Sequence, residues 1–199
     1  MSLAHSTDLS AADWIVRSNT PWHRLVTFGP LGFPEHARLR FIPDPAYPGQ
    51  PEHDAARDAA GLSDGEQFRV AVSTLVEHTR SPDDGYILIW EGWGARDLPR
   101  GALEGPRVAV PERPCVLFRG SLLDLASGAA QRAWWSRTHQ AMPVPAFVWP
   151  ADRAWCVACD VDPHWAGIGA EPEAVDRLLA ESRVDVVRAD PDEQQPFYR

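Results

Sequence analysis

Apolar and polar residues alternate along several stretches of this chain. Alternation predicts β-strands, because successive side chains of a strand point to opposite faces of a sheet. The clearest example is 153–162, where tryptophan, valine and cysteine alternate with small and acidic residues. An Asp-Pro-His turn sequence overlaps its end. Residues 165–169 then predict the second strand of a hairpin, in which Gly167 and Gly169 would allow another backbone to approach closely.

Other apolar runs complete the set of predicted strands. The run 86–90 is apolar on both faces, as expected of a central strand that is covered on two sides. Strands are also predicted at 25–28, 37–42, 115–119 and 184–187, with the last of these at an edge of the sheet.

Helices are predicted where apolar residues recur every three or four positions. Residues 64–79 show this period most clearly, with Ser63 or Asp64 as a cap and Pro82 as a stop. Further helices are predicted at 10–16 after a capping-box sequence, at 129–139 and from Pro172 onwards, while Ser121 opens a helical turn. The sequence therefore predicts an α+β fold: a mixed, mainly antiparallel sheet with two or three helices packed on it.

The length of the chain fits one domain. Its 199 residues can bury a substantial core, and no boundary divides 1–199. Four prolines in 43–53 predict an irregular surface loop, and the polar tail 189–199 is expected to fray.

Charge and composition narrow the class of function. A net charge of −9 without a basic run argues against nucleic-acid binding, which depends on neutralised phosphates. No apolar run approaches the ~18 residues of a membrane-spanning helix, and 1–14 lacks the regions of a signal peptide. Three cysteines without framework spacing are typical of a reducing compartment. We therefore expect a cytoplasmic protein that binds neither nucleic acid nor membrane; the sequence does not define its oligomeric state.

Four segments carry a resemblance to a known family. They are GFPEHARLRFIPDP (32–45), IWEGWG (89–94), CVLFRGSLLD (115–124) and WPADRAWCVACDVD (149–162). In these segments the chain resembles a family of uncharacterised bacterial proteins, mainly actinobacterial, with W-[ED]-G-[WY]-G and WP-x-D-R-x-W-C-V-A elements. The resemblance covers most of the chain and implies kinship of fold. The family has no established activity, so it implies no catalytic residues. A threonine is common in the family where Cys159 stands here, which makes the C-x-x-C spacing incidental.

Cys156 and Cys159 have the C-x-x-C spacing of zinc and redox sites. Residues three apart on a strand face opposite sides, so we expect these thiols to diverge and to act as small buried hydrophobes. A zinc site is the less favoured alternative. The seven histidines show no metal-ligand spacing, and the sequence contains no nucleotide-binding or nucleophile-elbow motif. No metal or cofactor is expected.

Three carboxylates are the candidates for catalysis. Asp160 and Asp162 share a strand face, and Glu91 follows the buried strand that ends at Trp90. Paired carboxylates can perform acid–base chemistry or bind a hard cation. Strand-end carboxylates more often stabilise a turn or bind loop backbone. One hypothesis is therefore a small hydrolase or small-ligand-binding enzyme with a pocket at the strand ends.

Tryptophans supply the other set of candidates. The chain has nine of them, and tryptophan beside arginine and carboxylates is typical of protein-interaction hot spots. The candidate binding residues are Trp90, Trp93, Arg153 and Trp165. The favoured hypothesis is a non-enzymatic module that binds a protein partner, in the manner of a toxin-neutralising immunity protein. The acidic balance would suit a basic partner.

Overall fold

The computed structural model describes residues 3–56, 61–94 and 97–199. Within these ranges nine strands form one sheet in the order β1-β5-β3-β6-β7-β8-β2-β9, with β4 paired to β5. Every one of these pairings is antiparallel, which confirms the predicted α+β fold. The strands are β1 (Ala4–His5), β2 (Glu35–Arg40), β3 (Gly85–Trp90), β4 (Val108–Val110), β5 (Arg113–Gly120), β6 (Phe147–Pro150), β7 (Trp155–Ala158), β8 (Trp165–Ala170) and β9 (Asp185–Arg188).

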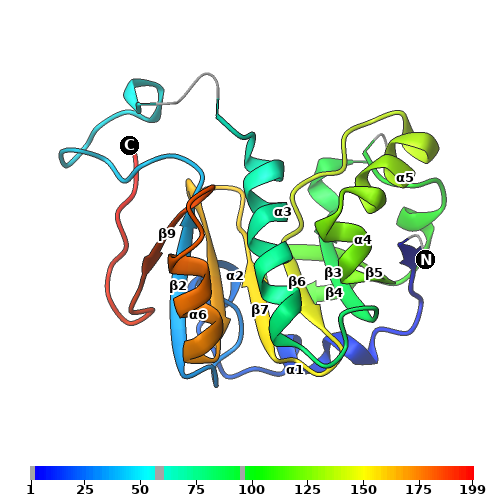
Figure 1. Ribbon diagram of the computed structural model, residues 1–199. Coiled ribbons are helices and arrows are strands. Elements are labelled where there is room, and N and C mark those ends of the chain that lie inside the picture. The colour runs from blue at the N-terminus through cyan, green and yellow to red at the C-terminus, as the bar shows by residue number, and fades with distance from the viewer. Residues whose placement is uncertain (1–2, 57–60, 95–96) are drawn as a thin grey trace.

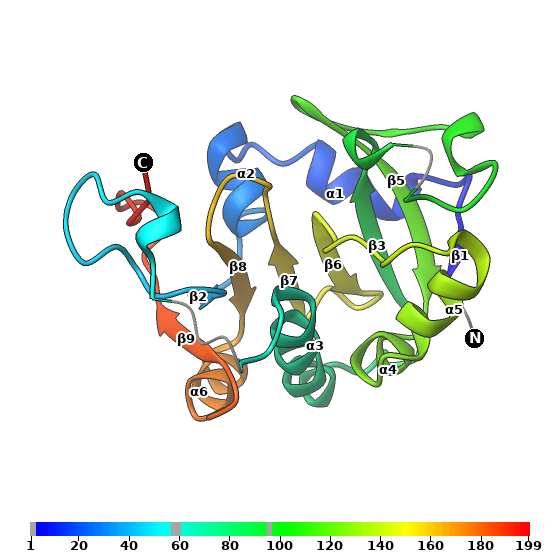
Figure 2. The same cartoon turned by 90° about the horizontal axis from the view of Figure 1, so that it is seen from above.

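Helices cover both faces of the sheet (Figures 1 and 2). Helices α1 and α2 lie on one face, α3, α4 and α6 lie on the other, and α5 packs beside α4. Six α-helices in the described ranges exceed the two or three that the sequence predicted. They are α1 (Asp13–Val16), α2 (Trp22–Phe28), α3 (Asp64–Leu75), α4 (Leu122–Ala126), α5 (Ala129–Thr138) and α6 (Pro172–Leu179).

The two faces of β7 separate two cores, as the alternation of its side chains predicts. Trp155 and Val157 belong to the core beneath α3, α4 and α6, whereas Cys156 and Ala158 belong to the core beneath α1 and α2. All four side chains are buried. β7 pairs with β8, so the predicted hairpin is present.

The N-termini of the helices show which of the predicted caps and short elements are correct. α3 begins with a capping box, in which Ser63 and Glu66 satisfy each other's backbone N–H groups. The capping box predicted at 10–13 is wrong, because Ser10 and Asp13 do not cap each other; the Ser10 N–H instead donates a 3.0 Å hydrogen bond to the carboxylate of Asp8. The strand predicted at 25–28 is also wrong, since these residues form the second half of α2. A short apolar run does not distinguish a buried strand from the buried face of a short helix.

Two glycines let α2 and its following loop lie directly on the sheet. A Cβ on Gly167 of β8 would lie 2.1 Å from the carbonyl oxygen of Thr27 in α2. A Cβ on Gly169 would lie 2.4 Å from the ring of Phe33. The close approach that the sequence predicted at these positions is therefore present.

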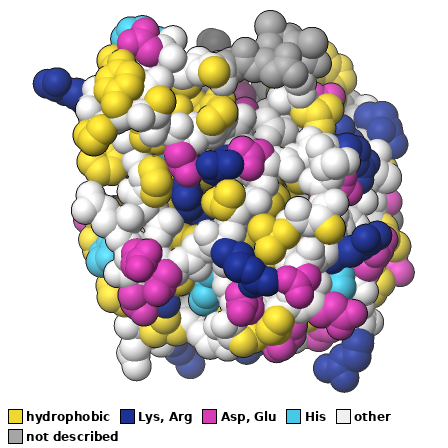
Figure 3. Space-filling model, turned by 60° about the vertical axis from the view of Figure 1, so that its left-hand side comes forward, with side chains coloured by type: hydrophobic (Ala, Val, Ile, Leu, Met, Phe, Trp, Pro, Cys, Tyr) yellow, Lys and Arg dark blue, Asp and Glu magenta, His cyan; other side chains and the backbone are white. Residues whose placement is uncertain are grey.

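β9 forms an edge of the sheet, and charged side chains flank it. Arg188 forms ion pairs with Glu35 and Asp176, and Figure 3 shows acidic and basic side chains interspersed on this side of the molecule. Beyond β9, the chain returns along the proline-rich loop. There the hydroxyl of Tyr198 donates a 2.6 Å hydrogen bond to the carbonyl of Pro43.

Candidate functional site

Several strand ends enclose a small cleft, which we call the strand-end cleft. Its volume is about 170 Å³. Trp90 ends β3 and Phe147 begins β6, while Val26 of α2 and Asp64 of α3 contribute from opposite faces of the sheet. The other residues that line it are Phe41, Trp93, Arg113, Val144, Ala146, Cys159, Asp160, Val161 and Pro163. Three of the predicted site residues, Trp90, Trp93 and Asp160, therefore lie together.

Arg113 connects the charged and aromatic groups of this cleft. Its Nε donates a 2.9 Å hydrogen bond to Asp160, and its Nη2 lies 3.3 Å from a carboxylate oxygen of Asp162. Its guanidinium also lies over the ring of Trp90, 5.2 Å from the centroid. The hydrogen bond that Arg113 donates to Asp160 raises the pKa of the guanidinium, which therefore stays charged. The sequence pattern does not reveal Arg113 as a site residue, because Arg113 lies 47 residues before Asp160.

The two tryptophans of the cleft form an edge-to-face pair. Their ring centroids are 6.3 Å apart, with an interplanar angle of 72°. The tight turn 91–93 makes this possible, since a Cβ on Gly92 would lie 2.2 Å from the Trp90 ring. Trp90 is half-buried, whereas Trp93 is 44% exposed. The cleft thus presents one indole to solvent and holds the other against Arg113.

Glu91 does not join the aspartates. Its carboxylate accepts a 2.7 Å hydrogen bond from Nε of Arg107. The same guanidinium donates to the carbonyls of Leu103, at 2.6 Å, and Gly105. Glu91 therefore holds the 102–107 loop in place. The three candidate carboxylates Glu91, Asp160 and Asp162 are all bound to arginine.

Two of the predicted binding residues lie outside the cleft. Arg153 lies in the turn between β6 and β7, at the opposite end of these strands, where its guanidinium is 5.2 Å from the centroid of Trp14. Trp165 is buried, with its ring centroid 5.0 Å from that of Phe28. Trp165 therefore does not present its ring to solvent as a candidate binding residue would, because α2 covers its face of β8.

The cysteines lie in different environments. Cys156 is in the core beneath α1 and α2, whereas Cys159 packs against the core beneath α3. Burial raises the pKa of Cys159 to about 12 and also raises that of Cys156. Within the described ranges, no group of three or more His, Cys, Asp or Glu side chains could hold a metal ion. The two thiols occupy opposite faces, as strand alternation predicts.

A second charged cluster was not predicted, although three of its four members lie within the single segment 32–45. Asp44 accepts hydrogen bonds from Arg38 (2.7 and 3.0 Å), Arg40 (2.9 Å) and Nε2 of His164 (3.0 Å). Burial alone would raise the pKa of Asp44, but these hydrogen bonds outweigh it and hold that pKa well below its usual value. The sequence signal was Arg-x-Arg on a strand, which places both guanidiniums on one face. The cluster holds the proline-rich loop against β2 and β8.

No family model matches this chain, and no curated protein or solved structure matches it either. The described helices are too short or too polar for any of them to cross a membrane.

Proposed function

We propose that this protein is a binding module that recognises a protein partner through the strand-end cleft, with Trp93 as the central contact. The observation that carries the proposal is the contact of Arg113 with Trp90, Asp160 and Asp162. These bonds fix one wall of the cleft before any partner arrives, which lowers the entropy cost of binding. Interaction hot spots are enriched in tryptophan, so an exposed tryptophan on such a preorganised surface supports a binding role.

The charges of the cleft suggest the chemistry of the partner. Asp64, Asp160 and Asp162 outnumber the single guanidinium of Arg113 in and beside the cleft. A cation over the face of a tryptophan is attracted by its ring electrons. Arg113 makes this contact within the protein, and a basic side chain of the partner would make it on Trp93, near the carboxylate of Asp64. We therefore propose a basic partner.

A catalytic role is less favoured by this geometry. General acid–base chemistry requires a carboxylate within hydrogen-bond reach of a substrate. Glu91, Asp160 and Asp162 are instead directed at guanidinium groups. These carboxylates are therefore better suited to positioning the cleft than to proton transfer.

We further place the protein in the bacterial cytoplasm. The three cysteines are free, and two of them are fully buried between sheet and helices. A protein with free thiols fits a reducing compartment. A basic toxin would complement the acidic charge of this protein, and its neutralisation is the role that the sequence hypothesis suggested.

A comparison of two tryptophan variants tests the proposal. Tagged wild-type protein, Trp93→Ala and Trp135→Ala would each be used to capture partners from a lysate of the native cell. Trp135 is a matched control because it is also exposed but lies on α5, outside the cleft. The expected result is one basic protein that wild type and Trp135→Ala retain and that Trp93→Ala loses. With the purified partner, Trp93→Ala should weaken binding roughly thirtyfold, as for a hot-spot tryptophan.

The charge component has its own test. Asp64 is exposed at the start of α3, so Asp64→Asn should leave the fold intact and reduce the association rate, more at low salt than at high salt. If Trp93→Ala bound the partner as tightly as the wild-type protein does, the strand-end cleft would be excluded as the binding site. An acidic partner would contradict the charge argument.

A further inference from the structure

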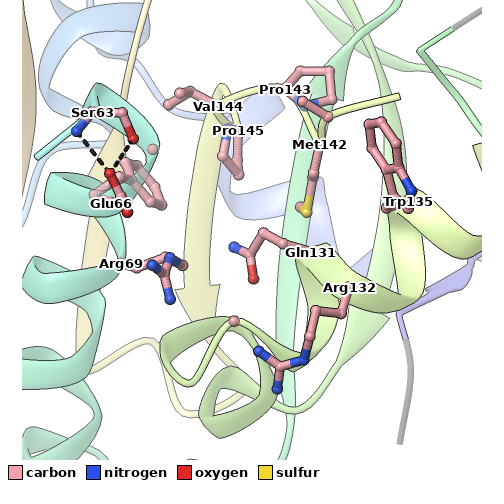
Figure 4. Close-up of a pocket in the computed structure, with 14 residues that line it drawn as sticks. Ser63, Glu66, Arg69, Gln131, Arg132, Trp135, Met142, Pro143, Val144 and Pro145 are labelled. Carbon is pink, nitrogen blue, oxygen red and sulfur yellow. Dashed lines mark hydrogen bonds between the residues drawn. The ribbon is translucent and has the colours of Figure 1, made fainter. Parts of the chain in front are cut away.

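A larger hollow lies on the other side of the 141–146 segment from the strand-end cleft. It has a volume of about 520 Å³. It lies between α3 and α5, and residues 141–145 close one side (Figure 4). We call it the helix groove. Its size is within the range of roughly 300 to 1,000 Å³ that small-molecule sites occupy.

One end of the helix groove is cationic. Arg69 of α3 and Arg132 of α5 approach the same glycine: a Cβ on Gly128 would lie 2.7 Å from Nη1 of Arg69 and 3.3 Å from Nη1 of Arg132. Neither guanidinium forms an ion pair with a carboxylate of the described residues. Glu66, which also lines the groove, interacts electrostatically with Arg69, and one oxygen of its carboxylate accepts hydrogen bonds from the N–H and hydroxyl of Ser63 at 2.9 and 2.6 Å.

Two like charges that lack a direct ion-pair partner repel each other, and an anion placed between them would relieve this repulsion. Planar guanidinium groups match a carboxylate especially well, because their N–H groups can donate to both of its oxygens. The rest of the protein carries an excess of acidic side chains, so these two arginines form a local exception to its net charge of −9.

The opposite end of the helix groove is apolar. Trp135, Met142, Pro143 and Pro145 line it, and Trp135 is 57% exposed. Figure 4 shows the side chain of Gln131 between this apolar wall and the two guanidinium groups. Its Oε1 is buried and has no hydrogen-bond partner among the described residues. Along its length, the groove therefore changes from a cationic end, past the amide of Gln131, to an apolar end.

We propose that the helix groove binds a small amphipathic acid, with its carboxylate between Arg69 and Arg132 and an alkyl or aromatic body against Trp135 and Met142. The charge gradient sets the orientation of this ligand, and the amide of Gln131 lies beside the junction of its polar and apolar parts. This inference does not depend on the proposed function, because none of these five side chains lines the strand-end cleft.

Octanoate is the probe that tests the proposal, with isothermal titration calorimetry as the measurement. Octanamide has the same body without the charge, and acetate has the charge without the body. Octanoate should bind at least tenfold more tightly than either. The variants Arg69→Gln and Arg132→Gln should each weaken octanoate about tenfold, the ratio expected for the loss of a hydrogen bond to a charged group. Arg80→Gln, which alters an exposed arginine outside the groove, should have no effect.

The apolar end is tested separately. Trp135→Ala should weaken octanoate but not acetate, while Trp93→Ala should leave both unchanged. Thermal unfolding of each variant would establish that it is folded. Equal affinity for octanoate and octanamide would overturn the proposal, as would octanoate binding that neither arginine variant reduces. Absence of heat up to millimolar octanoate would overturn it as well. Loss of partner capture in Trp93→Ala with octanoate binding intact would separate the two proposals.

Discussion

Arg113 and Asp160 form an ion pair that links two strands which are not neighbours. Arg113 begins β5 and Asp160 lies just beyond β7, and both β3 and β6 lie between these strands in the sheet. The 2.9 Å hydrogen bond therefore ties the strand ends together across the cleft. The two side chains are only 19% and 9% exposed. This pair fixes the shape of the site that we propose for partner binding.

The first prediction concerns the strength of this pair. Asp160→Asn removes the charge that compensates Arg113 in a largely buried place, and the guanidinium retains only the exposed Asp162. Removing one partner of a buried pair is strongly destabilising. We expect the free energy of unfolding to fall by about 2 kcal/mol, measured by urea denaturation.

Asp84→Asn is the matched control. Asp84 forms a two-bond ion pair with Arg119 at 2.7 and 2.8 Å, but both side chains are well exposed. An exposed pair of this kind contributes less than about 1 kcal/mol. Equal destabilisation by the two substitutions would show that burial does not strengthen the Arg113–Asp160 pair.

The sequence predicted the parts of the fold that depend on local pattern. The alternation at 153–162 predicted β7 and the two faces of its cysteines, and the period at 64–79 predicted α3 with its Ser63 cap. The sequence failed where distant segments decide the outcome. Residues 25–28 are helical because α2 packs on Gly167, and no local pattern contains that contact. Arg113 and the contact between Asp44 and His164 were missed for the same reason, since these partners lie 47 and 120 residues apart in the chain.

The second prediction concerns the thiols. Burial raises the pKa of Cys115 and of Cys159 to about 12, and raises that of Cys156 as well. Thiolate is the reactive form, so the folded protein should react slowly with a thiol reagent near pH 8. In buffer, Ellman's reagent should rapidly modify less than one thiol per molecule of folded protein. In urea, where the protein is unfolded, it should modify all three. Rapid modification of the native protein would contradict the burial of the thiols, and formation of a Cys156–Cys159 disulfide on mild oxidation would contradict their placement on opposite faces.

The third prediction tests the contact between α2 and the sheet. In Gly167→Ala the new methyl group would overlap the Thr27 carbonyl and the Phe28 side chain, so α2 would have to move away from β8. We expect a loss of at least 3 kcal/mol in unfolding free energy, or failure to recover folded protein. Gly65→Ala is the control. A Cβ there meets no atom within 4 Å, and alanine is favoured over glycine within a helix, so the substitution should stabilise the protein by about 0.5–1 kcal/mol. An unchanged urea midpoint for Gly167→Ala would disprove the close approach.

The fourth prediction concerns the pH dependence of stability and the His164–Asp44 contact. Burial lowers the pKa of His164, although the hydrogen bond to Asp44 opposes this effect. The folded state therefore binds the proton less readily than the unfolded chain, in which a histidine titrates near 6.5. It follows that His164 contributes stability above about pH 6.5 and that this contribution is lost as the pH falls below that value. Burial lowers the pKa of His5 and His36 in the same way.

His164→Gln separates this histidine from the others. The glutamine amide can still donate a hydrogen bond to Asp44, but it does not titrate. Asp44 stays ionised throughout the range, because its own pKa is held far lower. We expect the urea midpoint of the wild-type protein to fall between pH 7.5 and 5.5, and that of His164→Gln to fall less. Each unit by which burial lowers the pKa of His164 corresponds to about 1.4 kcal/mol of unfolding free energy. Identical pH profiles for the two proteins would mean that His164 titrates in the folded state as it does in the unfolded chain.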